Sequence, residues 1–200
     1  MKNVVKRRTK QNDKTVKAVL LGTIFLLLSC SQGLNWRETS VGDSGVSIWL
    51  PCKPNIATRQ IPLSEDRRVG EISINLIECE KEGVQYAVSY MDMNLASRVD
   101  AIRNKKGQID ISQWMKLWEK ASLQALGIKE EVQVGEWNEL KKKLNPGAQT
   151  TRVKNSSGLE AEFIWFGYEG TLYQVALYSM TPLEKNKELV KTFTTSLQVK

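Results

Sequence analysis

Cysteine and histidine carry much of the nucleophilic and metal chemistry of proteins, and this chain of 200 residues has three cysteines and no histidine. The absence of histidine excludes the usual Ser-His-Asp and Cys-His catalytic arrangements. It also removes the commonest protein ligand for zinc, copper and iron. The sequence therefore predicts no metal site and no cofactor, and its reactive side chains are Cys30, Cys52 and Cys79.

Cys30 ends a segment with the features of an export signal. The first 17 residues hold seven basic side chains and one acidic side chain, and an apolar run follows from Ala18 to Leu28. Eleven helical residues span only about 16 Å, roughly half of a bilayer's hydrocarbon core, so the run is too short for a transmembrane helix. At its end, Leu27, Leu28, Ser29 and Cys30 resemble a bacterial lipobox and depart from the small-x-small site of an ordinary signal peptide.

This resemblance implies that residues 1–29 are a lipoprotein signal peptide. Cleavage between Ser29 and Cys30 would make Cys30 the mature N-terminus, with diacylglycerol on its sulfur and an acyl chain such as palmitate on its amino group. Two or three acyl chains anchor a protein almost permanently, since each buried methylene adds about 0.8 kcal/mol. The position after Cys30 holds Ser31 and not aspartate. This resembles lipoproteins that are released to the outer membrane, and it implies a protein anchored there and facing the periplasm. The alternative is a plain signal anchor or a cleaved soluble protein in which Cys30 has no role.

Cys52 and Cys79 then remain as an even pair in an oxidising compartment, where disulfides form. Both fall at the ends of expected strands. Closing a loop of about 28 residues would stabilise the fold by roughly 3.5 kcal/mol on the chain-entropy model. A redox site is the alternative, but there is no CxxC spacing and no histidine to lower a thiol pKa. We predict a structural disulfide between Cys52 and Cys79.

The formal net charge of +7 is concentrated before the apolar run. Without that segment the chain has 22 basic and 21 acidic residues, a balance of +1. A nearly neutral domain lacks the basic footprint that binds a phosphate backbone, so nucleic acid is not an expected partner. The basic run at 141–143 could contact lipid headgroups, or it could lie in a solvated turn.

Two other polar patterns are weak signals for catalysis. Glu78, Glu80 and Glu82 alternate toward a turn, which favours a solvated charged face over a hydrolase pair or a metal site. The stretch GDSG at 42–45 resembles the nucleophile segment of chymotrypsin-like proteases, but no histidine can take a proton from Ser44. We interpret it as a turn.

Hydrophobic patterning divides the chain into a leader, a linker and a domain. Residues 30–44 are polar and turn-rich and are expected to form the lipidated N-terminus and a linker, and residues 45–200 a single domain. Strands are predicted at 46–50, 56–63, 71–80, 84–91, 131–137, within 149–154, and at 159–166 and 171–180. Helices are predicted at 95–102, at 111–126 with Gly127 as the stop, and after Pro182. The stripe formed by Trp114, Leu117, Trp118, Ala121 and Ala125 is expected to pack in the core.

This order of elements predicts an α+β domain with a largely antiparallel sheet packed against helices. The phrases VSIWLP, GTLYQVALYS and LVKTFTTSLQV, together with the mid-chain helix, resemble the layout of PsbP-like α/β/α sandwich domains over roughly residues 45–199. The resemblance implies a fold and not an activity, because that family shares no single catalytic motif and includes binding or accessory subunits.

We therefore expect a non-enzymatic lipoprotein, held in the membrane by its lipid, that binds an unidentified envelope protein or component. The alternative is an envelope hydrolase that acts on lipid or cell-wall material without histidine. A deep pocket lined by Ser or Asp with a Lys base would favour the hydrolase, and an exposed apolar or aromatic patch would favour binding.

The predicted hairpin supplies the aromatic candidates for such a patch. Strict alternation is expected to separate one set of side chains from another on the two faces of the sheet. The first set is Phe163, Trp165 and Tyr173, and the second is Ile164, Phe166 and Leu172. A three-layer sandwich would bury both sets and leave the binding site elsewhere.

Overall fold

The computed structural model describes residues 34–43, 45–62, 71–93, 111–128, 137, 140, 142, 144 and 147–200. All of them except Leu34 belong to a compact unit that spans Asn35–Lys200. The expected signal peptide with Ser29 and Cys30 lies outside the described residues, and so does the expected helix at 95–102. Of the expected strand at 131–137, only Trp137 is described, and it is buried.

The centre of this unit is an antiparallel sheet of six strands in the order β3-β4-β5-β8-β7-β6. The strands are β3 (Asn55–Pro62), β4 (Glu71–Lys81), β5 (Val84–Asp92), β6 (Gln149–Lys154), β7 (Glu160–Tyr168) and β8 (Thr171–Ser179). Two hairpins, β4–β5 and β7–β8, close through the two-residue turns Glu82–Gly83 and Glu169–Gly170, in which all four residues have positive φ. Such type I′ turns match the right-handed twist of the strands, and they fix the register of each hairpin.

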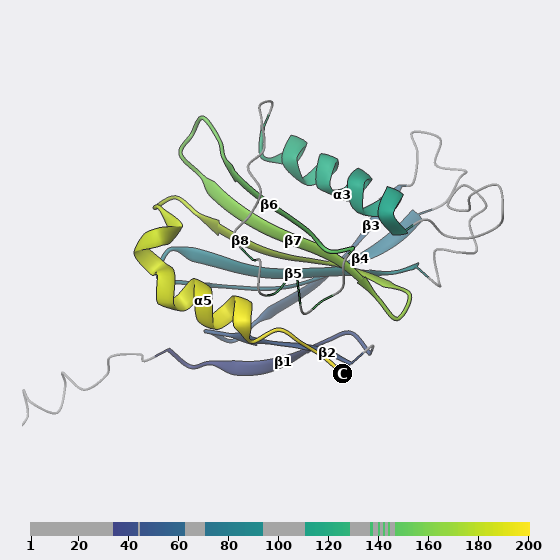
Figure 1. Ribbon diagram of the computed structural model, residues 1–200, viewed down its shortest axis with the longest axis horizontal. Helices are drawn as coiled ribbons and strands as arrows, with labels where there is room; N and C mark the ends of the chain where they lie inside the picture. Colours follow the sequence, from purple (N-terminus) through teal and green to yellow (C-terminus); the bar gives the residue numbers. More distant parts are fainter. Residues whose placement is uncertain are drawn as a thin grey trace, which may run out of the picture. The chain divides into compact units, whose positions relative to one another are not determined.

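A smaller sheet and a helix cover one face of the large sheet (Figure 1). The small sheet contains β1 (Arg37–Val41), β2 (Val46–Leu50) and β9 (Gln198–Val199), in the order β1-β2-β9. The 3-10 helix η3 (Leu183–Asn186) leads into α5 (Lys187–Thr195). Side chains from the large sheet, from the small sheet and from the segment η3–α5 meet in one core. There the ring of Phe193 lies edge-on against Tyr86 at a centroid distance of 5.1 Å.

The strand β1 occupies residues that the sequence analysis interpreted as a linker. It pairs antiparallel with β2 from Arg37 opposite Leu50 to Val41 opposite Val46. The described residues of the GDSG stretch, Gly42, Asp43 and Gly45, are turn residues, as expected, with positive φ at Gly42 and Gly45. The compact unit therefore begins before residue 45.

The helix α3 (Ile111–Ala125) lies on the opposite face of the large sheet (Figure 1). It ends at Ala125, and the predicted stop, Gly127, follows in a turn with a φ of 71°. The N–H of Ile128 donates to the carbonyl of Leu123 and the N–H of Gly127 to that of Gln124, each at 3.0 Å. This pair of bonds is a Schellman motif, in which the left-handed residue is usually glycine.

The structure confirms a mixed α+β fold whose two sheets are both antiparallel. The helices α3 and α5 lie on opposite faces of the six-stranded sheet. Each face has its own apolar core, and the two cores share no buried residue. The two faces can therefore be considered separately as sites.

Candidate functional site

Polar contacts fix one side of α3 to the strands β6 and β8. The hydroxyl of Thr151 on β6 donates to Glu119 Oε1 at 2.6 Å. The side-chain amide of Gln174 on β8 donates to Ser122 Oγ at 2.7 Å. Thr151 and Gln174 are both buried, so breaking either bond would leave a buried polar group without a partner. These bonds determine which strands the helix covers.

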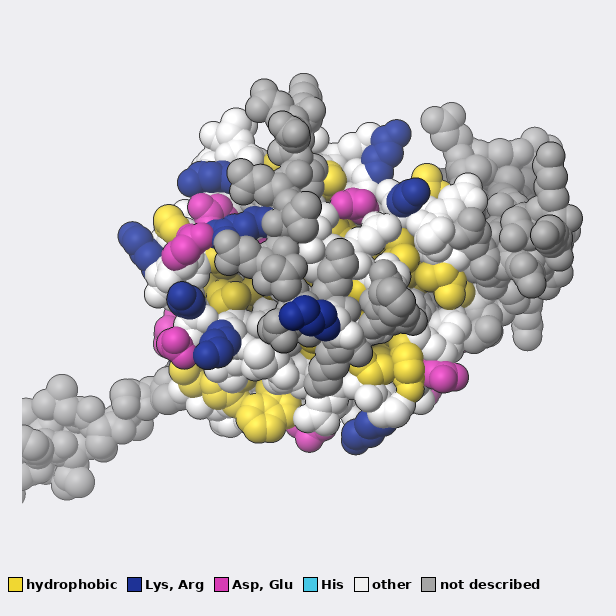
Figure 2. Space-filling model, in the orientation of Figure 1, with side chains coloured by type: hydrophobic (Ala, Val, Ile, Leu, Met, Phe, Trp, Pro, Cys, Tyr) yellow, Lys and Arg dark blue, Asp and Glu magenta, His cyan; other side chains and the backbone are white. Residues whose placement is uncertain are grey.

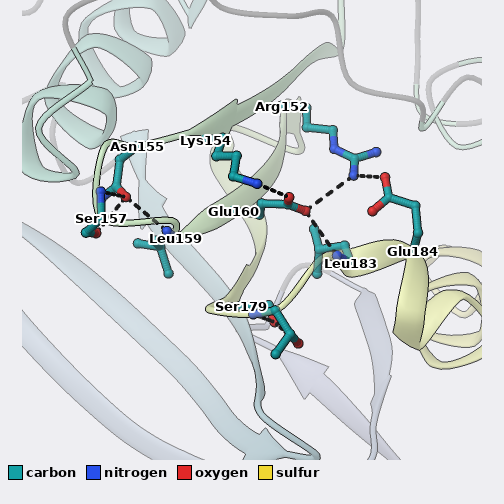
Figure 3. A network of polar contacts seen from close by, with 10 residues as sticks. Arg152, Lys154, Asn155, Ser157, Leu159, Glu160, Ser179, Leu183 and Glu184 are labelled. Carbon is teal, nitrogen blue, oxygen red and sulfur yellow. Dashed lines mark hydrogen bonds and ion pairs between the residues drawn. The ribbon is translucent and has the colours of Figure 1, made fainter.

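Both ends of α3 contact the half of the sheet that contains β6 and β7. At the start, Ile111 lies directly against Gly167 of β7, where a Cβ would be only 2.9 Å from Ile111 Cγ2. At the end, Asn155 donates from Nδ2 to the carbonyl of Leu126 at 3.1 Å. The oxygen of the same amide accepts hydrogen bonds within the β6–β7 turn, including the N–H of Ser157 at 3.0 Å (Figure 3). Asn155 thus joins the helix end to the turn.

The other side of α3 faces β3, β4 and β5 and forms with them an apolar groove of about 470 Å³. Its lining residues are Trp114, Leu117, Trp118, Ala121, Ser122 and Ala125 from the helix, and Ile61, Ile72, Ile74 and Met91 from the sheet. Hydrophobic side chains gather between the positions of α3 and of β3 and β4 in Figure 2. This volume is within the range of roughly 300–1,000 Å³ that is usual for small-molecule sites.

Several lining side chains are accessible to a ligand. Leu117 is 50% exposed and Ile61 is 41% exposed. Trp114 and Trp118 are half-buried. Ser122 is the one polar residue of the lining, and its oxygen already accepts a hydrogen bond from Gln174. Contiguous apolar surface that remains accessible commonly marks a binding site.

The helical spacing predicts that this stripe packs in the core, which is wrong for the exposed Leu117, Ala121 and Ala125. The structure confirms that Trp114 and Trp118 pack against the core, but it also shows both rings lining the groove. The available signal was the width of the stripe. Leu117 lies about 100° around the helix from Trp118, which is farther than a single line of contact with a sheet requires.

The predicted disulfide between Cys52 and Cys79 is present, with a Cα–Cα distance of 6.0 Å. It joins the segment after β2 to β4, and Cys79 belongs to the core on the α5 face. The bond therefore stabilises the face opposite the groove. It links the small sheet to the large one.

The hairpin aromatics do not form an exposed patch. All six candidate side chains are buried, and their predicted grouping is wrong at two positions. Phe166 lies opposite Tyr173, and Gly167 lies opposite Leu172. Leu172 therefore shares a face with Phe163 and Trp165, whereas Tyr173 stacks on Phe166 with ring centroids 4.9 Å apart.

A second cluster of polar side chains joins β6 and β7 to η3 (Figure 3). The buried Glu160 accepts from the N–H of Leu183 at 3.0 Å and from Lys154 Nζ at 3.2 Å. Arg152 bridges Glu160, at 3.5 Å, and Glu184. Burial alone would raise the pKa of Glu160, but the hydrogen bonds from Leu183 and Lys154 outweigh it and hold this pKa below its usual value. The cluster positions the segment that leads into α5.

The charged residues suggest no metal centre within the described part of the chain. It contains no group of three or more Cys, Asp or Glu side chains placed to hold a metal ion. Of the three alternating glutamates, Glu78 accepts a hydrogen bond from Gln85 at 2.7 Å, whereas Glu80 and Glu82 are exposed. The apolar groove is thus the feature of the described residues that is best suited to bind a ligand.

None of the helices that the structure describes is long and apolar enough to cross a membrane. The chain matches no family model, no curated protein and no solved structure.

Proposed function

We propose that this protein is a lipid-anchored, non-enzymatic binding module of the bacterial cell envelope. Cys30 carries the lipid and holds the domain at the outer membrane, facing the periplasm. The basic leader, the short apolar run and the sequence Leu27-Leu28-Ser29-Cys30 support the anchor. The helices on both faces of an antiparallel sheet support the PsbP-like resemblance, a family that includes binding and accessory subunits.

The groove beside α3 is the observation that carries the binding function. Nine of its ten lining side chains are apolar, and the volume suits a small apolar ligand or chain. The hydrolase alternative needs a nucleophile within hydrogen-bond reach of a base. The lining offers the hydroxyl of Ser122, whose neighbour is the amide of Gln174 and not a lysine or a carboxylate.

Photolabelling with a neutral alkyl probe tests the groove directly. The full chain is reconstituted in phospholipid nanodiscs and labelled with a diazirine-bearing dodecanol, and the labelled peptides are located by mass spectrometry. We expect the label on α3 and on β3–β5. The substitution Ala121→Phe should reduce this labelling because it fills the groove, whereas Gln124→Phe, at an exposed position outside the lining, should not. Uniform labelling of the surface, or equal labelling of Ala121→Phe, would show that the groove binds no ligand.

Metabolic labelling with a clickable fatty acid tests the anchor separately. The wild-type protein should carry the label and should need detergent for extraction from membranes. Cys30→Ser should lose it. Equal labelling of the variant, or a mature protein that retains Lys17, would contradict the lipobox interpretation.

A further inference from the structure

We infer that the ligand of the groove is a single-chain fatty acid, with its hydrocarbon chain beside α3 and its carboxylate at Arg59. This inference rests on the proposed binding function of the groove. It adds the chemical class of the ligand and the residue that recognises its head.

The register of β3 and β4 puts Arg59 on the face of the sheet that carries the groove, beside two of the lining residues. Arg59 is directly opposite Ile74, and it comes two residues before Ile61, and both of these line the groove. Opposed residues, and alternate residues of one strand, share a face of the sheet. The residues between them confirm the alternation, since Thr58 and Gln60 bond across the other face to Asn75 and Ser73, each at 2.8 Å.

The charge of Arg59 is available to a ligand. Its side chain is exposed, and it forms no ion pair with any residue that the structure describes. On this face of β4 the residues after Ile74 are Leu76 and then Glu78, whose carboxylate is engaged with Gln85. An arginine next to an uncharged groove complements a carboxylate, which it can bind through two parallel hydrogen bonds.

The shape of the groove favours one extended chain. Its helical lining runs from Trp114 to Ala125 in a single stripe, which spans about 16 Å along the helix axis. The opposite wall is the row Ile61, Ile74, Ile72 and Met91 across three neighbouring strands. An apolar volume of about 470 Å³, with Arg59 on the same face of the sheet, fits a hydrocarbon chain that ends in an anionic head.

Paired ligands of equal length test the role of the head. Dodecanoic acid and dodecanol compete with the photoreactive dodecanol for the full chain in nanodiscs, with empty nanodiscs as the blank. We expect the acid to compete about three- to tenfold better than the alcohol, as for a partly exposed ion pair, and to lose this advantage at high salt. Within the groove, each added methylene should improve competition by up to about fourfold.

Charge reversal at Arg59 tests the residue. Arg59→Glu should abolish the preference for the acid and leave competition by the alcohol unchanged, and Arg59→Lys should retain part of the preference. Lys116→Glu is the matched control, since it makes the same change of charge at an exposed position of α3 outside the groove. Circular dichroism of each variant verifies that it is folded.

The outcomes separate the two proposals. If neither compound competes with the probe in the wild-type protein, the groove is not a binding site and both proposals fail. If acid and alcohol compete equally, or if Arg59→Glu keeps the preference, the fatty-acid inference is wrong and the apolar groove stands. If a diacyl phospholipid competes better than the acid, the occupant is a membrane lipid. If protection of the groove increases with protein concentration, the occupant is a second copy of the chain. Either result would also overturn the inference.

Discussion

The contact between α3 and Gly167 makes a sharp test of how the groove is built. In Gly167→Ala the new Cβ would lie 2.9 Å from Ile111 Cγ2 and 3.5 Å from Ile111 Cδ1. Because isoleucine branches at Cβ, its Cγ2 cannot move away without a change of rotamer or of the helix. Such overpacking costs roughly 1–3 kcal/mol. Replacing a strand glycine by alanine also raises the free energy of unfolding by about 0.5–1 kcal/mol, because alanine loses less backbone conformational entropy on folding. We expect a net loss of stability of about 1 kcal/mol.

Urea unfolding of the single and double variants measures this effect. Ile111→Ala removes Cγ2, so the double variant should be more stable than the sum of the single changes predicts, by about 1 kcal/mol. Gly147→Ala is the control, because a Cβ at Gly147 would meet nothing within 4 Å. The double-mutant cycle therefore isolates the steric term from the general effect of replacing glycine.

Two results would refute the reasoning. Gly167→Ala could leave the free energy of unfolding within about 0.3 kcal/mol of the Gly147→Ala control, which would mean that the helix shifts without cost. Alternatively, the changes at Gly167 and Ile111 could prove additive, which would mean that the two residues are not in contact. In either case the start of α3 would not be fixed by this packing.

Four further changes test other parts of the fold. Because the pKa of Glu160 is lowered in the folded state, its contribution to stability is complete above the unfolded-state pKa near 4.5 and is lost as the pH falls through the folded-state pKa. Glu160→Gln should therefore lower the free energy of unfolding at pH 7 by about 1–3 kcal/mol. It should also flatten the acid side of a plot of stability against pH. Tyr86→Phe should raise the stability by about 1 kcal/mol in thermal unfolding, because the buried Tyr86 hydroxyl has no hydrogen-bond partner among the described residues; a loss of that size would reveal a partner. Glu169→Asn should raise the urea midpoint, by about 0.5–1 kcal/mol in free energy, since asparagine tolerates the positive φ of 47° better than glutamate does. Cys79→Ser should lower the stability by about 3.5 kcal/mol for a bond that spans 27 residues, and an unchanged urea midpoint under oxidising conditions would contradict this estimate.

The sequence is informative where burial alone determines the pattern. Residues such as Val46, Ile48 and Leu50 alternate with less buried neighbours, and this period defines β2 in the structure as it does in the sequence. The disulfide is predicted from the even number of cysteines left after Cys30 and from the oxidising compartment that the export signal implies. In contrast, β1 has only Val41 as a buried residue. Its place as a strand depends on backbone pairing with β2, which leaves no apolar period to detect.

To predict which side chains of the β7–β8 hairpin share a face of the sheet, the length of the turn is needed as well as the alternation within each strand. With the two-residue turn Glu169–Gly170, an odd-numbered residue of β7 always lies opposite an even-numbered residue of β8. Leu172 therefore accompanies Trp165, and Tyr173 accompanies Phe166. Alternation within each strand cannot supply this relation, because one residue more or less in the turn reverses it.

The groove follows from the geometry of covering a wide sheet. Six strands spaced about 4.8 Å apart extend over roughly 24 Å, whereas one helix with its side chains is about 10–12 Å wide. On one face, α5 and the small sheet both pack on the large sheet and share one apolar core with it. On the other face, the bonds of Thr151 and Gln174 hold α3 toward β6 and β8. The apolar side chains of β3–β5 then extend beyond the helix, and the side of α3 that faces them is apolar as well. Water is a poor solvent for both surfaces, so an apolar occupant of the space between them is energetically favoured, as the proposed fatty-acid chain would be.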